Sequence, residues 1–394
     1  PNADTLSEED ARLVVANEQG YAFWSKYESY LNLDASVQQV IRTVRDGDLV
    51  RLQALLRADP LAANPRWVRP DLAPPEIPND SIPLHCLAEA SFNGTNRRGN
   101  DFELARALIQ AGADVEIDNG GPLKSAVSYN ALGAVRALLE GGAAVDGPDG
   151  SGMPLAYALG FGFTEIAELL ASFGAALDLR FAAGLGRLDV VKRFVNPDGS
   201  LTPDAGRLAD PYENRFRCER TRANVLCQAL AFAALAARLE TVEYLLELGA
   251  DVNQEVPGVN QLGGTVLHWL TAGVPVGASG DPHRDDERRV PVIELLLRHG
   301  AKRTIPDSRF HSTPLGWAYH HRATRIFELL SSDASAHDAA CFGLVERLRA
   351  LLDLDPSLVD ARDDLGRTPL GCLTPDTPAA EEIRDLLIAR RADF

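Results

Sequence analysis

Apolar and polar positions along this chain follow the period of short helices that come in pairs. Residues 313–330 read Thr-Pro-Leu-Gly-Trp-Ala-Tyr-His-His-Arg-Ala-Thr-Arg-Ile-Phe-Glu-Leu-Leu. Thr313 is placed to cap a first helix, and Pro314 falls in its first turn, where the fixed φ of proline suits a helix. Ile326 and Leu330 share one face of a second helix. Because helices this short are marginal in water, the pattern predicts a helix pair that packs against copies of itself.

Both halves of this pattern recur along the chain. Similar starts lie at 82–85, 121–123, 153–155, 265–268 and 368–370, and similar ends at 108–115, 138–145, 243–253 and 295–302. A Thr-Pro-Leu-His start, a Leu-Leu-x-x-Gly-Ala end and a spacing of about 33 residues resemble the ankyrin repeat. The resemblance covers most of 36–394. It implies an all-α solenoid of about nine to ten helix-turn-helix units, joined by short β-turn or hairpin loops.

The ends of the chain and its insertions depart from this repeat. Residues 1–35 do not match it, and we interpret them as a helical N-terminal cap on the solenoid of residues 36–394. Proline, glycine and charged residues mark insertions at about 60–81, 91–100, 196–222 and 274–289. Long loops in a compact array are usually binding loops, lids or disordered segments. The insertions therefore indicate either a specialised surface or a tolerant edge.

Aromatic residues occupy equivalent positions in successive first helices. Directly after the four-residue start, five consecutive units carry an aromatic ring, and the last two carry Asp338 and Cys372. The five rings are Tyr157, Phe181, Phe232, Trp269 and Trp317. Ankyrin repeats usually have a leucine-like residue here, packed between neighbouring helices. The rings are therefore either inter-repeat core or a ladder partly open to the concave groove.

A second set of positions, three and four residues further along, is normally polar and faces that groove. Here it includes Tyr129, Phe161, Leu185 and Leu235. An exposed apolar patch rimmed by charge usually marks an interaction surface. We therefore expect an apolar, aromatic-lined groove, to which Tyr319 also belongs, that accepts an amphipathic peptide or a hydrophobic small molecule.

Composition narrows the choice of partner. A formal net charge of −17 argues against nucleic acid, whose phosphates require a basic surface, and favours a protein partner with a basic surface. The five cysteines are scattered without metal-ligand spacing, so we expect reduced thiols, no metal site and a cytoplasmic location. No apolar run reaches the roughly 20 residues that span a bilayer, and no signal peptide is visible. A leader removed ahead of Pro1 stays open. Arginine far exceeds lysine, as in GC-rich bacterial sequences.

Motifs for chemistry are scarce. The sequence contains no phosphate-binding glycine loop, HExxH, GxSxG or EF-hand motif, so no cofactor is indicated. His85 and His268 fill the fourth position of the repeat start, where ankyrin repeats use histidine to bridge backbone groups. His311, His320 and His321 are candidates for proton transfer if the protein is an enzyme. Adjacent helical residues point about 100° apart, so His320 and His321 would not chelate one ion.

Three classes of function remain open. The sequence favours a non-catalytic binding protein, an inhibitor or adaptor, whose acidic groove holds a basic or amphipathic protein partner. The first alternative is an enzyme on an ankyrin scaffold that acts on a hydrophobic small molecule through the three candidate histidines and a nearby carboxylate. The second is a binding protein for a small hydrophobic ligand. Neither nucleic acid nor a membrane is expected as a partner.

Overall fold

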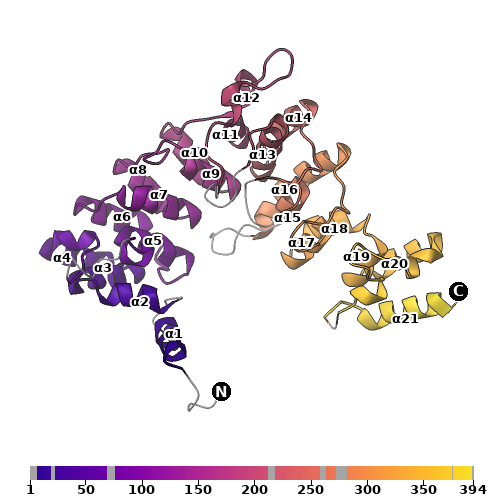
Figure 1. Ribbon diagram of the computed structural model, residues 1–394, viewed down its shortest axis with the longest axis horizontal. Helices are drawn as coiled ribbons and strands as arrows, with labels where there is room; N and C mark the ends of the chain where they lie inside the picture. The colour runs from indigo at the N-terminus through magenta and orange to yellow at the C-terminus, as the bar shows by residue number, and fades with distance from the viewer. Residues whose placement is uncertain are drawn as a thin grey trace. The chain divides into compact units, whose positions relative to one another are not determined.

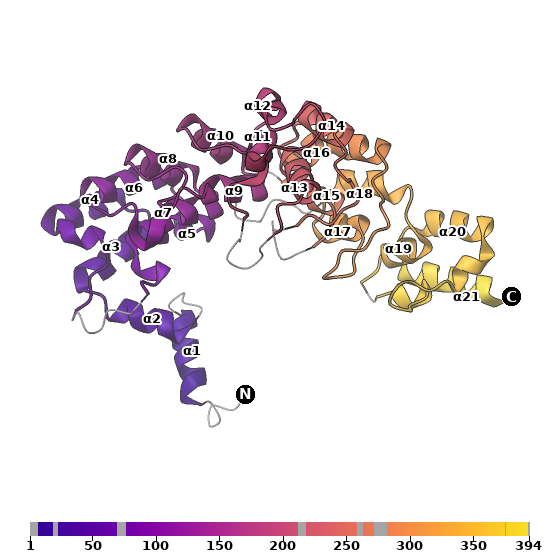
Figure 2. The same ribbon diagram turned by 45° about the horizontal axis from the view of Figure 1, so that its top comes forward.

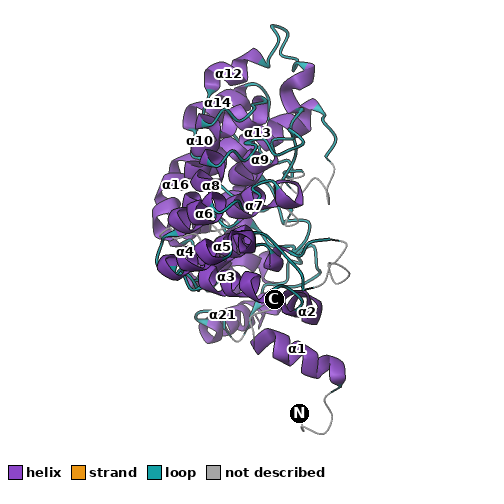
Figure 3. Cartoon of the chain, turned by 90° about the vertical axis from the view of Figure 1, so that its left-hand side faces the viewer, coloured by secondary structure: helices purple, strands orange, loops and turns teal. Residues whose placement is uncertain are grey.

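The computed structural model of the protein describes residues 7–18, 23–68, 76–211, 218–257, 263–271, 282–374 and 376–392. The chain divides into two compact units, residues 1–176 and 177–394. The described residues form helices and loops, with isolated β-bridges but no strand (Figure 3). None of the described helices has the length and apolar composition that a bilayer span requires. The prediction of an all-α repeat fold is confirmed.

The first unit consists of two leading helices and four helix pairs. The leading helices are α1 (Glu8–Glu18) and α2 (Trp24–Leu31). The pairs are α3 (Ala35–Arg45) with α4 (Leu49–Ala58), α5 (Pro83–Phe92) with α6 (Asp101–Gln110), α7 (Ile117–Ser128) with α8 (Leu132–Glu140), and α9 (Met153–Gly160) with α10 (Thr164–Ser172). The first helices of the pairs stack on one another in order, as do the second helices (Figure 1).

The second unit continues with five pairs. They are α11 (Leu179–Gly184) with α12 (Leu188–Arg193), α13 (Arg222–Leu235) with α14 (Leu239–Glu247), α15 (Val266–Thr271) with α16 (Pro282–Arg298), α17 (Pro314–His320) with α18 (Thr324–Ser331), and α19 (Ala336–Cys341) with α20 (Val345–Leu354). Helices α11, α13, α15 and α17 stack in order, and α14, α16 and α18 form a second row (Figure 2). The 3-10 helix η7 (Leu370–Cys372) and α21 (Ala380–Ala392) close the unit.

The predicted Thr313 cap is confirmed, and the next helix pair has an equivalent cap that the sequence analysis did not name. Thr313 Oγ1 accepts the Gly316 N–H at 3.3 Å, and Pro314 occupies the first turn of α17. Ser335 Oγ accepts the Asp338 N–H at 3.0 Å in the same way at the start of α19. Each hydroxyl satisfies one of the amide groups that a helix start leaves unpaired. The repeat start therefore encodes the helix start locally.

The insertions are more ordered than the sequence indicated. The first contains the 3-10 helices η2 (Pro60–Ala63) and η4 (Asn79–Ser81), and the third contains η5 (Pro203–Gly206). The expectation of a loop as far as residue 289 is wrong, because residues 282–289 form the first turns of α16. Arg289 accounts for part of this order, since its Nη1 donates to the Leu270 carbonyl at 3.2 Å. Residues 69–75, 212–217 and 274–281 of these insertions lie outside the described residues.

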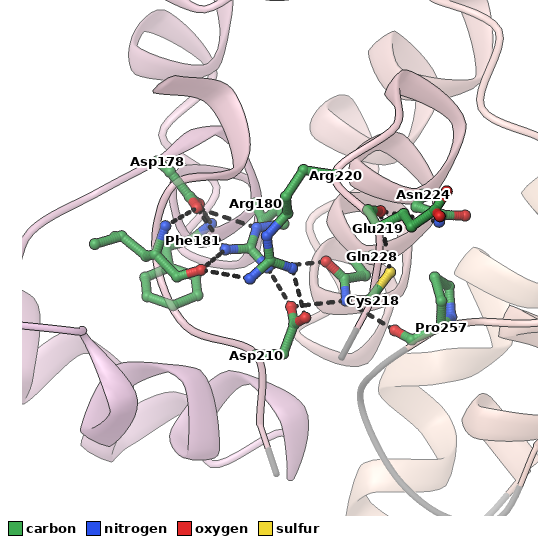
Figure 4. A network of polar contacts seen from close by, with 11 residues as sticks. Asp178, Arg180, Phe181, Asp210, Cys218, Glu219, Arg220, Asn224, Gln228 and Pro257 are labelled. Atoms are coloured by element: carbon green, nitrogen blue, oxygen red, sulfur yellow. Dashed lines mark hydrogen bonds and ion pairs between the residues drawn. The ribbon is translucent and has the colours of Figure 1, made fainter. Parts of the chain in front are cut away.

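A buried arginine ties the third insertion to the helices (Figure 4). Arg180 is 0 % exposed. Its Nε and Nη2 donate to Asp178 Oδ2 at 3.0 and 2.7 Å, and its Nη1 donates to Asp210 Oδ1 at 2.5 Å and Gln228 Oε1 at 2.9 Å. Nη2 also donates to the Leu208 carbonyl at 2.5 Å. All five guanidinium N–H groups therefore have an acceptor.

A second arginine completes this network from the far end of the insertion. Arg220 Nη1 donates to Asp210 Oδ2 at 2.5 Å, and Arg220 Nη2 donates to the Leu208 carbonyl at 2.9 Å. Two arginines and two aspartates thus balance one another's charge. The side chains of Asp178 and Asp210 are 0 % and 1 % exposed, so this balance is a condition for burying them.

Candidate functional site

A pocket of about 680 Å³ lies within the second unit, where two consecutive turns meet α17 and α19. Its size falls in the range of ligand-binding clefts, about 300–1,000 Å³. The residues that line the pocket include Phe310, His311, Thr313, Trp317, His320, His321, Ser335, His337, Asp338, Cys341, Phe342, Asp363, Asp364, Arg367 and Cys372. The pocket therefore combines aromatic, acidic and imidazole groups.

Asp307 organises the turn on one side of this pocket. Its buried carboxylate accepts the N–H groups of Arg309, Phe310 and Ser312 at 2.9, 2.5 and 2.9 Å. It also accepts Trp317 Nε1–H at 3.0 Å, which fixes the indole ring against the turn. Burial acts to raise the pKa of Asp307, but the hydrogen bonds from Phe310 N–H, Trp317 and Ser312 N–H together lower it. Asp307 therefore stays ionised and holds the wall in place.

An equivalent turn forms the opposite side. Asp363 accepts the N–H groups of Leu365 and Arg367 at 3.0 and 2.8 Å, and Arg367 Nε at 2.9 Å. His337 Nε2 lies 3.0 Å from the carbonyl oxygens of both Ala361 and Arg367, so it ties this turn to α19. The charge of Asp363 is thus already compensated by Arg367.

Asp338 differs from Asp363 because its side-chain hydrogen-bond donors are uncharged. Its Oδ1 accepts Thr313 Oγ1–H and its Oδ2 accepts Ser335 Oγ–H, each at 3.1 Å. Within the described part of the chain, no lysine, arginine or histidine forms a hydrogen bond or ion pair with it. Burial raises the pKa of Asp338 above its ordinary value, although the hydroxyl groups of Ser335 and Thr313 and the charge of His337 oppose this. The side chain is half-buried, and a ligand that covered it without bringing a cation would make its charge costly.

The aromatic wall of the pocket is formed by side chains of two neighbouring repeats, those that contain α17 and α19. Phe310 is 56 % exposed at the rim, and its ring centroid lies 6.4 Å from that of Trp317. Phe342 lies deeper, at 8 % exposed, and contacts Tyr319 with a centroid separation of 4.9 Å. Tyr319 itself packs between Phe327 and Phe342 and does not line the pocket. Its predicted place in a ligand groove is therefore not supported by its position.

The three candidate catalytic histidines all line this pocket, but without the partners that proton transfer needs. His321 contacts the Trp317 ring and His320 the Tyr319 ring, with centroid separations of 6.1 and 5.8 Å. Among the described residues, none of His311, His320 and His321 forms a hydrogen bond with a carboxylate. Burial, followed by the charge of His320 and Arg289, lowers the pKa of His321.

The two thiols in the pocket are poor nucleophiles, because only the thiolate reacts. Burial raises the pKa of Cys341, and it raises that of Cys372 to about 11. The described residues also contain no group of three side chains placed to hold a metal ion. Among the described residues of the pocket, neither thiol is therefore an activated nucleophile, and no three side chains form a metal centre.

The groove predicted across the middle repeats is not an open apolar strip in the second unit. Leu185 and Leu235, which we expected in solvent, are 3 % and 9 % exposed, and Phe181 and Phe232 are fully buried. The last two rings meet across the contact between α11 and α13, with centroids 6.3 Å apart. The prediction is corrected for Leu185 and Leu235, because close packing of neighbouring first helices covers them. For Phe181 and Phe232 the same packing selects inter-repeat core over the groove, the two alternatives that the sequence left open.

The remaining predicted groove residues differ in exposure. Trp269 is also buried, at 4 % exposed, and its Nε1 donates to the Gly263 carbonyl at 3.3 Å. In the first unit Tyr129, Tyr157 and Phe161 are half-buried. Tyr157 stacks on Phe161 with centroids 6.0 Å apart, and Tyr129 contacts Phe92 at 5.0 Å. These three rings can contribute to a surface of the first unit.

Sequence reasoning missed Asp338 as a site residue, although a signal was present. Asp338 occupies the position at which five earlier repeats carry an aromatic ring, and Trp317 and Cys372 occupy it in the repeats on either side. All three line the pocket. Because a carboxylate and a thiol fill less volume than rings, these two repeats leave space where the others are packed.

Comparison with known proteins adds a likeness in fold. Neither a protein-family model nor a curated protein matches this sequence. Among solved structures, the chain is similar to the human ASB11 ankyrin repeat domain, with 22% sequence identity over 78% of this chain and 97% of that chain. The TM-score of this match is 0.30, so the superposition carries no argument about function. The class that the helix pairs define is an all-α repeat protein.

Proposed function

We propose that this protein is a non-catalytic binding module that holds a segment of a basic or amphipathic protein partner. The observation that supports this most is the pocket in the second unit, where a half-buried carboxylate without a cationic hydrogen-bond partner lies together with aromatic side chains. A chain with a formal net charge of −17 attracts basic partners over a distance. An inhibitor or an assembly adaptor would both work in this way.

The two alternatives are less well supported by the same pocket. Acid-base catalysis needs a base that another group orients, and among the described residues no carboxylate forms a hydrogen bond with His311, His320 or His321. A hydrophobic small molecule would gain from the aromatic wall, but it would leave Asp338 buried without a cation, which is unfavourable. A cationic protein segment satisfies both the wall and the carboxylate.

A peptide selection tests the proposal. Random 12-residue peptides displayed on phage are selected on the full-length protein, and selected peptides are then measured by fluorescence anisotropy. We expect Phe310→Ala, which removes an exposed ring from the rim, to weaken binding at least fivefold. The matched control is Leu354→Ala, since Leu354 is 85 % exposed on α20 and does not line the pocket. Selected peptides that bind both variants as they bind the unmodified protein would place the interaction elsewhere and refute the proposed site.

A further inference from the structure

The carboxylates around the pocket differ in how their charge is compensated. Asp363 pairs with Arg367 and accepts two backbone N–H groups, and Asp364 is exposed to solvent. Asp338 is held by two hydroxyl groups, which orient its oxygens but carry no charge. Of the three, Asp338 is therefore the group whose energy improves most when a cation arrives.

The stacking of the repeats gives this carboxylate room for a ligand. The aspartate stands in the row of inter-repeat positions that holds Trp317 before it and Cys372 after it. In earlier repeats the row is filled by rings such as Phe181 and Phe232, which contact each other directly. Where the row reaches Asp338 it opens into the pocket. A ligand side chain can thus enter the layer in which the other repeats place their own rings.

The hydroxyl groups that hold Asp338 come from two different repeats. Thr313 caps α17, and Ser335 caps α19, so each side chain is already fixed by the helix start that it caps. A carboxylate positioned by fixed groups is preorganised, which lowers the entropy lost on binding. The nearby aromatic faces favour a cation as well, because their quadrupole attracts positive charge.

From this arrangement we propose that the pocket recognises one cationic side chain of the partner, a lysine ammonium or an arginine guanidinium, which ends at the Asp338 carboxylate between the aromatic walls. The inference rests on the proposed function, since it names the group of the partner segment that anchors it. The charge-assisted hydrogen bond to Asp338 supplies the specificity. Uncharged side chains of the same length are rejected because they would bury Asp338 without a cation.

Binding of a cation at this place is linked to protons. Burial holds the pKa of Asp338 above its usual value, and a bound cation favours the ionised form, so binding displaces a proton when the pH is near that pKa. On acidification Asp338 becomes neutral, which removes the charge that attracts a cation. The titratable and charged groups that line the pocket with Asp338 are His311, His320, His321, His337, Cys341, Asp363, Asp364, Arg367 and Cys372. Affinity is therefore expected to fall as the pH falls.

The test uses two small probes and the full-length protein. The probes are the N-acetyl methylamides of lysine and of norleucine, which have side chains of similar length with and without the ammonium group. Binding is followed in ¹⁵N–¹H spectra through the indole N–H of Trp317, which the Asp307 carboxylate holds at the pocket wall. Trp317→Phe identifies that resonance among the four tryptophans. We expect the lysine probe to shift it in a saturable manner and the norleucine probe to leave it unchanged.

Two variants test which carboxylate of the pocket binds the lysine probe. Asp338→Asn keeps the shape of the side chain and is expected to weaken the lysine probe at least tenfold. Asp364→Asn removes the exposed carboxylate of the same pocket and is expected to change affinity less than twofold. Circular dichroism melts check that both variants fold. Should Asp338→Asn be unfolded, the decision passes to the unmodified protein, in which affinity for the lysine probe must drop as the pH is lowered within the range where the protein stays folded.

The outcomes separate this inference from the proposed function. Equal binding of the lysine and norleucine probes, or of the lysine probe to both aspartate variants, overturns the cation assignment, as does an affinity that does not fall with pH. If selected peptides still depend on Phe310 in that case, the pocket remains a peptide site with another anchor. If peptides do not depend on Phe310 but the lysine probe behaves as expected, the cation site exists and the proposed protein partner is wrong.

Discussion

Replacing Arg180 by methionine tests whether the buried network holds the second unit together. The methionine side chain has similar length and fits an apolar surrounding, but it carries no charge and no donor. It would leave the carboxylates of Asp178 and Asp210, which are 0 % and 1 % exposed, with one buried cation fewer. The insertion that contains Asp210 would also lose its direct tie to α11.

The size of the effect follows from what remains after the substitution. Removing one partner of a buried ion pair costs about 3–5 kcal/mol of unfolding free energy. Asp178 keeps the N–H groups of Phe181 and Leu208 at 3.1 and 3.2 Å. Asp210 keeps Arg220 and Gln228, at 2.5 and 2.9 Å. These remaining donors reduce the loss, so we expect about 3 kcal/mol, the lower end of that range.

Urea unfolding of the full-length protein measures this loss. Trp269 and Trp317 report on the second unit, provided that Trp24 and Trp67 of the first unit are replaced by phenylalanine in every protein compared. Urea is chosen because it is uncharged and does not screen ion pairs. If the two units unfold in separate transitions, only the transition of the second unit is compared.

The matched control is an arginine in an exposed pair of the same unit. Arg193 lies 3.2 Å from Asp189, and both side chains are at least 70 % exposed, so Arg193→Met is expected to cost less than about 1 kcal/mol. Adding Asp178→Asn to Arg180→Met should restore at least about 1 kcal/mol, because it removes one unpaired buried charge. The reasoning is refuted if Arg180→Met is no more destabilising than Arg193→Met.

Further substitutions separate side chains that look equivalent in the sequence. His268→Leu should cost about 2–3 kcal/mol, since its ring accepts the Thr265 N–H and lies 3.2 Å from the Ser312 carbonyl. His85→Leu should be neutral or stabilising in the same urea assay, because neither buried ring nitrogen of His85 has a hydrogen-bond partner among the described residues. Gly343→Ala, at φ +79° with a Cβ only 2.6 Å from the Pro378 carbonyl oxygen, should lower the melting temperature clearly more than Gly300→Ala. Gly300 has φ +86°, but a Cβ added there would have open space around it. Equal shifts of the melting temperature would therefore contradict the steric argument.

The difference between the two histidines has a structural cause. His268 finds a threonine three residues earlier and the carbonyl that precedes the next repeat start. At His85 the first of these positions is Ile82, whose backbone N–H is already bonded to the Asn79 carbonyl. The residues before the next start, 118–120, adopt left-handed conformations. Our expectation that both histidines bridge backbone groups therefore holds for His268 and is wrong for His85.

The local pattern of apolar and polar residues was enough to predict much of the fold of this protein. The period of apolar residues predicts the helix pairs, and hydroxyl residues such as Thr313 and Ser335 cap the helices that follow them. Such signals are readable because a helix and its cap involve residues within a few positions of one another. The same reasoning failed at residues 282–289, where charge and proline suggested a loop. A contact from Arg289 to a carbonyl 19 positions earlier is not visible in local sequence.

The candidate site brings together residues from different repeats, and the local pattern of apolar and polar residues does not show which of them meet. Equivalent positions in the repeats became either core, as at Phe181 and Phe232, or pocket wall, as at Trp317 and Asp338. Composition and repeat spacing by themselves established an acidic, all-helical array. Tertiary structure decided which side chains meet water, because burial depends on how closely the next repeat packs, and that closeness depends on volumes contributed by both neighbours.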